Sequence, residues 1–282
     1  MKVHQQTKKL TESAVMLALS TVLSILPLAQ LPYGGSVTVA SMLPIVLISY
    51  RHGIGWGMGT GLVFGIIQQL LGLSNLSYFT TWQSILAIIL LDYLVAFAAA
   101  GLGGAFRRLQ HIPQREALLL GSLLAALVRY ACHVISGATV WAGLSIPTEA
   151  ALAYSFVYNA TYMVPEAIVL VLVAYYLGSM LDFKKEQITR LPTVRTVSRA
   201  ANLLSAAAGL VGVAALIFDT VMVFSRMQDA ETGEFNVSLL KVEELAGSFW
   251  VPVLLVSAIA AAFAVIMLAV RRVLLRRTAI AS

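Results

Sequence analysis

Eight long apolar stretches constrain the fold of this chain more than any other feature. They occupy residues 12–28, 37–50, 54–73, 82–106, 116–141, 151–181, 200–225 and 248–270. A helix of about 20 apolar residues spans the hydrocarbon core of a bilayer. The second stretch is shorter and contains Pro44, so we expect it to cross only partly or at a tilt. Because 59% of the 282 residues are hydrophobic and 11% charged, we predict an all-α integral membrane protein and exclude a soluble domain.

Basic residues are distributed unevenly among the connecting segments. If the amino terminus is cytoplasmic, sixteen of the 19 lysines and arginines fall in cytoplasmic segments. Arg226 and Lys241 fall outside, and Arg129 lies within the membrane. This bias is the one that the positive-inside rule describes. We therefore expect a multi-pass protein with both termini in the cytoplasm, whose net charge of +6 reflects its topology and not binding to nucleic acid.

Polar residues inside the apolar stretches indicate where a ligand binds. A charged side chain at membrane depth is costly and usually marks a ligand, ion or proton site. At a rise of ~1.5 Å per residue, Asp92 lies ~15 Å from the outer end of its helix, Arg129 ~16 Å and His133 ~10 Å. On the next helix, Tyr154 lies at ~5 Å and Asn159 at ~13 Å from the outside. Residues of three helices thus share the outer half of the membrane, which predicts a cavity open to the exterior.

The residue types in this layer favour a small organic cation with a flat ring. A carboxylate binds a cation by charge pairing, and aromatic side chains bind it through cation–π contacts. Asn159 and His133 offer hydrogen bonds to the edge of a heterocycle. An anionic substrate would require more arginine than Arg129 alone. The candidate substrate-binding residues are Asp92, Tyr93, His133, Trp141, Tyr154, Tyr158 and Asn159.

Each candidate also has a purely structural interpretation. Asp92 and Arg129 share a depth and would form a buried ion pair. His133 would be a neutral core histidine bonded to a backbone carbonyl, and Trp141 an ordinary anchor at the membrane interface. Glu166 lies too deep for the predicted cavity and has no assigned role. A packed stripe would account for the tyrosines that recur every four residues, Tyr154, Tyr158 and Tyr162.

Small residues recur at helical spacing in two of the apolar stretches. Gly57, Gly61 and Gly65 lie four residues apart, and Ala14 and Ala18 form a similar flat patch in the first stretch. Such stripes let a neighbouring helix approach closely. They predict either packing within one chain or docking onto another membrane subunit.

Four segments carry a resemblance to a known family. They are residues 34–37 (GGSV), 91–97 (LDYLVAF), 129–137 (RYACHVISG) and 154–165 (YSFVYNATYMVP). In order and spacing, roughly residues 10–180 resemble the thiamine-specific substrate-binding subunits (S components) of bacterial energy-coupling factor transporters. The resemblance implies a six-helix thiamine-binding domain in residues 1–183. A basic cytoplasmic linker, residues 184–199, and two additional transmembrane helices of unknown role, residues 200–282, extend beyond the family's pattern.

The resemblance also assigns roles by position. It implies that Asp92 pairs with thiamine, that Trp141 stacks on it, and that the rings are contacted by His133, Tyr154 and Asn159. The loop of residues 28–40 corresponds to the lid, where Tyr33 is the aromatic residue available in place of the tryptophan of some members.

The partners implied by the resemblance follow from the same positions. Ala14 and Ala18 match the alanine motif that docks onto a transmembrane coupling subunit, which two separate ATPases drive. This chain contains no G-x-x-x-x-G-K-[ST] motif. We therefore expect neither a cofactor nor a metal of its own, and we expect delivery of thiamine across the plasma membrane to depend on those partners.

Other functions remain compatible with the same residues. Ser136, His133 and Asp92 would serve an intramembrane hydrolase, although no G-x-S-x-G elbow is present. Asp92 and His133 would alternatively relay protons in a proton-coupled carrier of an organic cation. An S component for another heterocyclic vitamin, or for a thiamine precursor such as the hydroxymethylpyrimidine, would share the whole architecture. We expect a thiamine-binding subunit that is not an enzyme.

Overall fold

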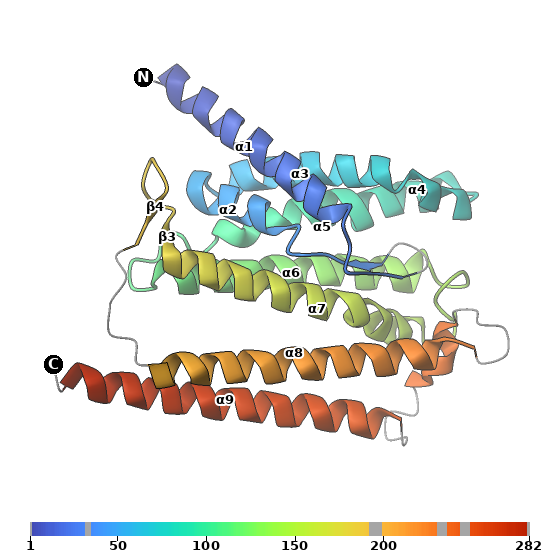
Figure 1. Cartoon of the computed structure of the whole chain (residues 1–282). Coiled ribbons are helices and arrows are strands. Elements are labelled where there is room, and N and C mark those ends of the chain that lie inside the picture. Colours follow the sequence, from blue (N-terminus) through green and yellow to red (C-terminus); the bar gives the residue numbers. More distant parts are fainter. Residues whose placement is uncertain (1, 32–34, 192–198, 230–235, 243–248, 281–282) are drawn as a thin grey trace. The chain divides into compact units, whose positions relative to one another are not determined.

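The computed structural model describes residues 2–31, 35–191, 199–229, 236–242 and 249–280, and it divides into two compact units, residues 1–191 and 192–282. Figure 1 shows that both are built mainly of helices. The helices of the first unit are α1 (Lys2–Ser24), α2 (Leu43–His52), α3 (Ile54–Leu71), η2 (Leu73–Tyr78), α4 (Trp82–Ile88), η3 (Ile89–Val95), α5 (Ala96–Ala98), η4 (Ala99–Gly104), α6 (Gln114–Thr139) and α7 (Ala151–Met180).

The connection between the first two helices is a short β-hairpin. α1 ends at Ser24, and strands β1 (Ala29–Gln30) and β2 (Ser36–Val37) pair antiparallel before α2 begins. α2 has ten residues, which gives a length of ~15 Å, about half of a bilayer core of ~30 Å. All of its residues from 43 to 50 are buried. α2 is therefore a short interior helix, as the partial crossing predicted for this stretch requires.

The fourth apolar stretch is one continuous helix over residues 82–104, and its middle is irregular. Ile89–Val95 has π-helical hydrogen bonding, a rare distortion that is frequent at functional sites. α3 packs on this helix through glycines: a Cβ added to Gly61 or Gly65 would lie 2.5 or 2.7 Å from its backbone carbonyl oxygens. A Cβ on Gly57 would lie 2.3 Å from that of Ser49 on α2. The glycine stripe thus packs within the chain.

α6 and α7 lie side by side and complete the hydrophobic core (Figure 1). Phe64 and Phe97 meet edge to face with ring centroids 5.1 Å apart, and Leu118 and Leu170 are fully buried beside them. Burial of a side chain of this size stabilises a fold by about 1.5–3 kcal/mol. Directly after α7 in the chain, strands β3 (Leu181–Asp182) and β4 (Thr189–Arg190) form a second hairpin.

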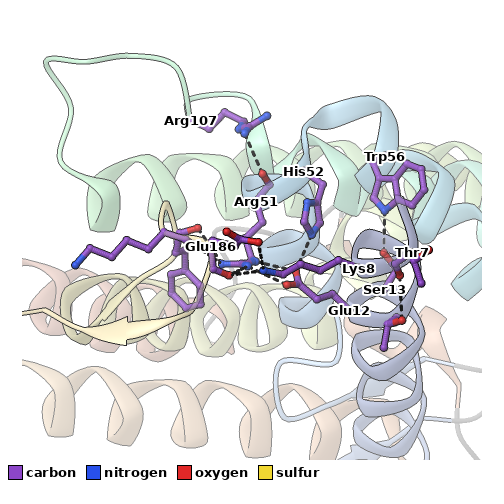
Figure 2. A network of polar contacts seen from close by, with 12 residues as sticks. Thr7, Lys8, Glu12, Ser13, Arg51, His52, Trp56, Arg107 and Glu186 are labelled. Atoms are coloured by element: carbon purple, nitrogen blue, oxygen red, sulfur yellow. Dashed lines mark hydrogen bonds and ion pairs between the residues drawn. The ribbon is translucent and has the colours of Figure 1, made fainter. Parts of the chain in front are cut away.

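A polar cluster fastens α1 to α2 and to this second hairpin, and Figure 2 shows its contacts. The Arg51 guanidinium donates Nε–H and Nη2–H to the two carboxylate oxygens of Glu12, both at 3.0 Å. His52 Nε2 lies 2.7 Å from Glu12 Oε2. Arg51 also donates to the carbonyl oxygens of Phe183 and Glu186 at 3.1 Å. One arginine therefore joins three elements at this end of the unit.

Six helices of the described chain are long and apolar enough to cross a membrane. They are α3, the helix over residues 82–104, α6, α7, and residues 203–227 and 250–274. Each of the eight predicted stretches contains a helix, but α1 and α2 fall short of this criterion. In α1 the first half carries lysines and Glu12, and α2 is too short.

The second unit is a helical hairpin. It contains α8 (Arg199–Met227), η5 (Val237–Leu240) and α9 (Trp250–Ile280). The Trp250 indole donates to the carbonyl oxygen of Leu240 at 3.1 Å, and the Ser257 hydroxyl on α9 donates to Asp219 on α8. Hydrogen bonds between helices add to van der Waals packing in holding helices together in an apolar medium.

Candidate ligand-binding site

A cavity of about 470 Å³ lies within the first unit, between the first hairpin and the helices. Its volume is within the range of small-molecule sites, about 300–1,000 Å³. Its walls come from both strands of the first hairpin, from α3 and η2, from the π-helical turn, and from α6 and α7. The cavity is lined by six of the seven residues predicted from the sequence: Asp92, Tyr93, His133, Trp141, Tyr158 and Asn159.

Asp92 is the centre of a hydrogen-bond cluster on the cavity wall. Its Oδ1 lies 3.0 Å from His133 Nδ1, and its Oδ2 accepts from the Ser136 hydroxyl at 2.8 Å and from the Trp141 indole N–H at 3.0 Å. All three partners lie on α6 or directly after it, while Asp92 lies on the π-helical turn. The carboxylate is thus fixed by three donors, and in the described part of the chain no lysine or arginine forms an ion pair with it.

The contact with Asp92 also orients His133. An ionised carboxylate only accepts hydrogen bonds, so Nδ1 of a neutral His133 is the donor and Nε2 remains an acceptor. His133 Nε2 is buried and has no hydrogen-bond partner among the described residues. An unsatisfied buried nitrogen costs free energy. A ligand that donates an N–H or O–H at this point of the cavity would remove that cost.

Aromatic side chains form much of the remaining wall. Trp141 packs edge to face with Phe79 at 4.8 Å between ring centroids. The Tyr93 hydroxyl accepts from the Asn75 side chain at 3.2 Å. Tyr158 and Tyr162 lie at 6.0 Å in the same edge-to-face geometry, and both line the cavity. These rings provide flat apolar faces beside a carboxylate, the combination predicted for a ring-bearing cation.

Two of the predicted residues have positions that the sequence did not anticipate. Tyr154 is 5% exposed but does not line the cavity. Asn159 does line it, but its amide is already engaged: Nδ2 donates to the carbonyl oxygens of Ser155 at 2.8 Å and of His133 at 3.3 Å, and Oδ1 accepts from Tyr162. In this structure Asn159 therefore positions the neighbouring wall residues.

The structure decides between the interpretations left open for Arg129. Its Nη1 donates to Glu166 Oε2 at 2.9 Å, and its guanidinium lies over the Phe97 ring at 4.6 Å. Asp92 is not its partner. Glu166, predicted to lie too deep for the site, lines the cavity together with Arg129. That prediction was wrong because it compared Cα depths, whereas the long arginine side chain extends the polar wall toward Glu166.

The geometry does not support the hydrolase. Ser136 donates its hydroxyl to Asp92, and His133 also bonds Asp92. In a nucleophilic triad the serine hydroxyl bonds the histidine, which the carboxylate orients from its other side. Here the carboxylate takes both hydrogen bonds, so Ser136 lacks the histidine base of such a triad.

Sequence reasoning missed the polar side chains contributed by the first hairpin and by η2. Thr38, Ser41 and Asn75 line the cavity, and no spacing pattern in the sequence distinguished them from ordinary loop residues. Tyr33, the predicted aromatic residue of the lid, lies outside the described residues. Ala14 and Ala18 lie on the exposed face of α1, where a partner helix has access to them.

Comparison with known proteins places these observations in a family. The family model described as thiamine transporter protein (Thia_YuaJ) matches residues 10–185. The thiamine transporter ThiT of Bacillus subtilis (strain 168) is 38% identical over an alignment of 183 residues, and the match covers 61% of this chain and 91% of that protein. A solved structure of ThiT from Listeria monocytogenes shares the fold with a TM-score of 0.52 at 21% identity, over 62% of this chain and 94% of that chain. The chain described here belongs to the thiamine transporter protein family.

Proposed function

We propose that this chain is the high-affinity thiamine-binding subunit of an energy-coupling factor importer. The family is one of membrane transport proteins and not of enzymes. A relative that is 38% identical is itself a thiamine transporter, which favours thiamine over other small vitamins. The cavity supplies the binding site, and residues 1–183 form the binding domain.

One observation carries the choice of ligand: Asp92 lies in a cavity with aromatic walls, and its hydrogen-bond donors carry no fixed charge. Ser136 and Trp141 are neutral donors, and among the described residues no lysine or arginine forms an ion pair with Asp92. The carboxylate therefore keeps an uncompensated negative charge in a partly buried position. A permanent cation such as the thiazolium ring of thiamine supplies the missing charge without a proton.

The remaining walls suit the other features of thiamine. Trp141, Tyr93 and Tyr158 line the cavity, where an aromatic ligand can pack against their rings. His133 Nε2, which has no partner in the described structure, accepts a hydrogen bond from the amino group of the pyrimidine ring. Tyr154 does not line the cavity, so in this proposal it supports the wall residues and does not contact the ligand.

Energy for import comes from separate proteins in this proposal. The chain contains no phosphate-binding loop motif, so a coupling subunit and two ATPases drive delivery. Ala14 and Ala18 on the exposed face of α1 form the docking patch. The bias in basic residues supports cytoplasmic termini in the plasma membrane. Residues 184–199 form a linker, and residues 200–282 add two helices without an assigned role.

Thiamine titration of the purified chain in detergent tests the ligand. Trp141 lines the cavity, so a stacked ligand should quench its fluorescence. We expect saturable quenching at submicromolar thiamine that Asp92→Asn abolishes. A folded protein that shows neither quenching nor heat of binding contradicts the proposal, and competition with the hydroxymethylpyrimidine then tests for a precursor.

Uptake into vesicles tests the need for partners. Vesicles that contain this chain alone should bind thiamine without accumulating it. Accumulation driven by a proton gradient would instead establish the alternative carrier, for which the contact between Asp92 and His133 would provide the proton relay.

A further inference from the structure

Glu166 has no role in the proposed pairing of Asp92 with thiamine, yet it is 3% exposed and lines the cavity. Its Oε2 is held by Arg129 on α6. Its other oxygen, Oε1, accepts from the Thr38 hydroxyl at 2.7 Å, and the Ser41 hydroxyl lies 3.4 Å away. The carboxylate therefore joins α6 and α7 to the chain between β2 and α2.

The segment that Glu166 holds is a wall of the cavity. Residues 35–41, called here the wall segment, run from the first hairpin to α2, and four of them line the cavity: Gly35, Ser36, Thr38 and Ser41. A Cβ added to Gly35 would lie 3.0 Å from the ring of Tyr162. Tyr162 and Glu166 are one helical turn apart on the same face of α7. The wall segment is thus seated on α7 at two successive turns.

The hydrogen bond between Thr38 and Glu166 is buried and is supported by a neighbouring backbone hydrogen bond. Thr38 is 4% exposed and Ser41 2%, and the backbone N–H of Ser41 donates to Thr38 Oγ1 at 3.3 Å. This turn fixes the hydroxyl that donates to the carboxylate. A hydrogen bond to an ionised group is roughly twice as strong as one between neutral groups. Arg129 pairs with Glu166 at 2.9 Å, so this carboxylate needs no cationic ligand as its counterion.

We propose that Glu166 is a positioning residue that holds the wall segment against α7 through Thr38, and that this contact sets how long thiamine stays bound. The inference rests on the function proposed above. Loss of the Thr38 hydroxyl frees the wall segment, which borders the ligand. It does not remove any group that pairs with the cationic ring. The effect should therefore appear in the dissociation rate, while the association rate changes little.

The test is stopped-flow fluorescence of thiamine binding to the full chain. We expect Thr38→Val to raise the dissociation rate about tenfold, the scale of one charge-assisted hydrogen bond, with the association rate changed less than about threefold. Thr38→Ser keeps the hydroxyl and should restore the slow rate. Thr60→Val is the matched control, since Thr60 bonds the carbonyl of Trp56 within its own helix and does not line the cavity.

A second variant separates this role from general stability. In a background that replaces both charges of the pair, Glu166→Gln with Arg129→Leu, Thr38→Val should add less than about twofold to the dissociation rate, because partners in one contact are not additive. If the valine and serine variants of Thr38 release thiamine equally fast, or if Thr38→Val matches the native rate, the proposal is overturned while the binding function stands. A native chain that does not bind thiamine overturns both.

Discussion

Asp92 in the cavity and Glu12 at the junction of α1 and α2 are each satisfied by three contacts, but the charges of their partners differ. Glu12 accepts two hydrogen bonds from the Arg51 guanidinium and contacts His52. Asp92 accepts from a serine, a tryptophan and a histidine. An arginine is charged at every pH at which the protein is folded, so the charge of Glu12 is balanced within the protein.

The comparison shows that satisfied hydrogen bonds and balanced charge are separate properties. Donors such as Ser136 and Trp141 hold a carboxylate in place without cancelling its charge, and a cationic ligand can then bind to it. Glu166 resembles Glu12, since Arg129 balances it, although it lines the same cavity as Asp92. Of these three carboxylates, Glu12 and Glu166 have an arginine partner and hold elements together. Asp92 has no arginine partner among the residues that the structure describes and is available to the ligand.

The largest expected effect is on folding, from Glu166, whose side chain is 4% exposed whereas that of Glu12 is 24% exposed. Glu166→Gln leaves the Arg129 charge buried without its counterion, which should lower the free energy of unfolding by about 3–5 kcal/mol. Thermal unfolding in detergent measures the loss. The double variant Glu166→Gln with Arg129→Leu should recover most of it, because removing both charges of a buried pair is often neutral. A single variant as stable as the native chain would contradict this view of Glu166.

The next effect concerns ligand charge. Asp92→Asn should weaken thiamine binding about 100-fold, or about 2.7 kcal/mol, because the cation loses its counterion. Binding of a neutral aminopyrimidine fragment should change less than about threefold, because its contacts lie elsewhere. Calorimetry with both ligands gives the comparison. Equal losses would mean that Asp92 shapes the site only through His133, Ser136 and Trp141.

Sequence reasoning predicted the cavity well where Cα depth and residue type were sufficient. Asp92, His133 and Trp141 share a layer when residues are counted along their helices, and the structure places them in contact. The pairing of Arg129 with Glu166 escaped this count because the length and direction of a side chain decide it. Tyr154 is a related case, because its depth is suitable but it does not line the cavity.

The fold was predictable to a similar degree. Each apolar stretch contains a helix, since the cost of burying backbone polar groups in a membrane leaves few alternatives. The bounds were less predictable: α1 begins ten residues before its stretch and α9 ends ten residues after its own. The π-helical turn at residues 89–95 has no such signature in the sequence. The pairing of β1 with β2 also depends on tertiary contacts, because strands of two residues are too short to show a pattern.

A smaller effect is expected at the junction of α1 and α2. Glu12→Gln removes the counterion of Arg51, but this guanidinium keeps the carbonyl partners of the second hairpin. We expect a loss of about 1 kcal/mol in the free energy of unfolding and faster hydrogen exchange in α1. Thiamine affinity should stay within about twofold, which makes Glu12→Gln the carboxylate-to-amide control for Asp92→Asn. A large fall in affinity would show that the two regions are coupled.

The smallest effect is the pH dependence that His52 contributes. Burial lowers the pKa of His52 below its usual value of 6.5, and the hydrogen bond with Glu12 offsets part of that fall while Arg51 and Lys9 add to it. The unfolded chain therefore binds a proton at His52 more readily than the folded chain. The stability gained from the neutral ring is present above pH 6.5 and is lost as the pH falls through the lower folded value.

Unfolding of native protein and of His52→Gln between pH 7.5 and 5.5 isolates this contribution. The native chain should lose stability over this window, and the variant should lose less. Glu12 titrates only in the more acidic range. Burial raises its pKa, but the hydrogen bonds with Arg51 and His52 bring it below 4.5. The stability that ionised Glu12 contributes is therefore lost only at lower pH. If His52→Gln were as sensitive as the native chain between pH 7.5 and 5.5, the titrating group would lie elsewhere.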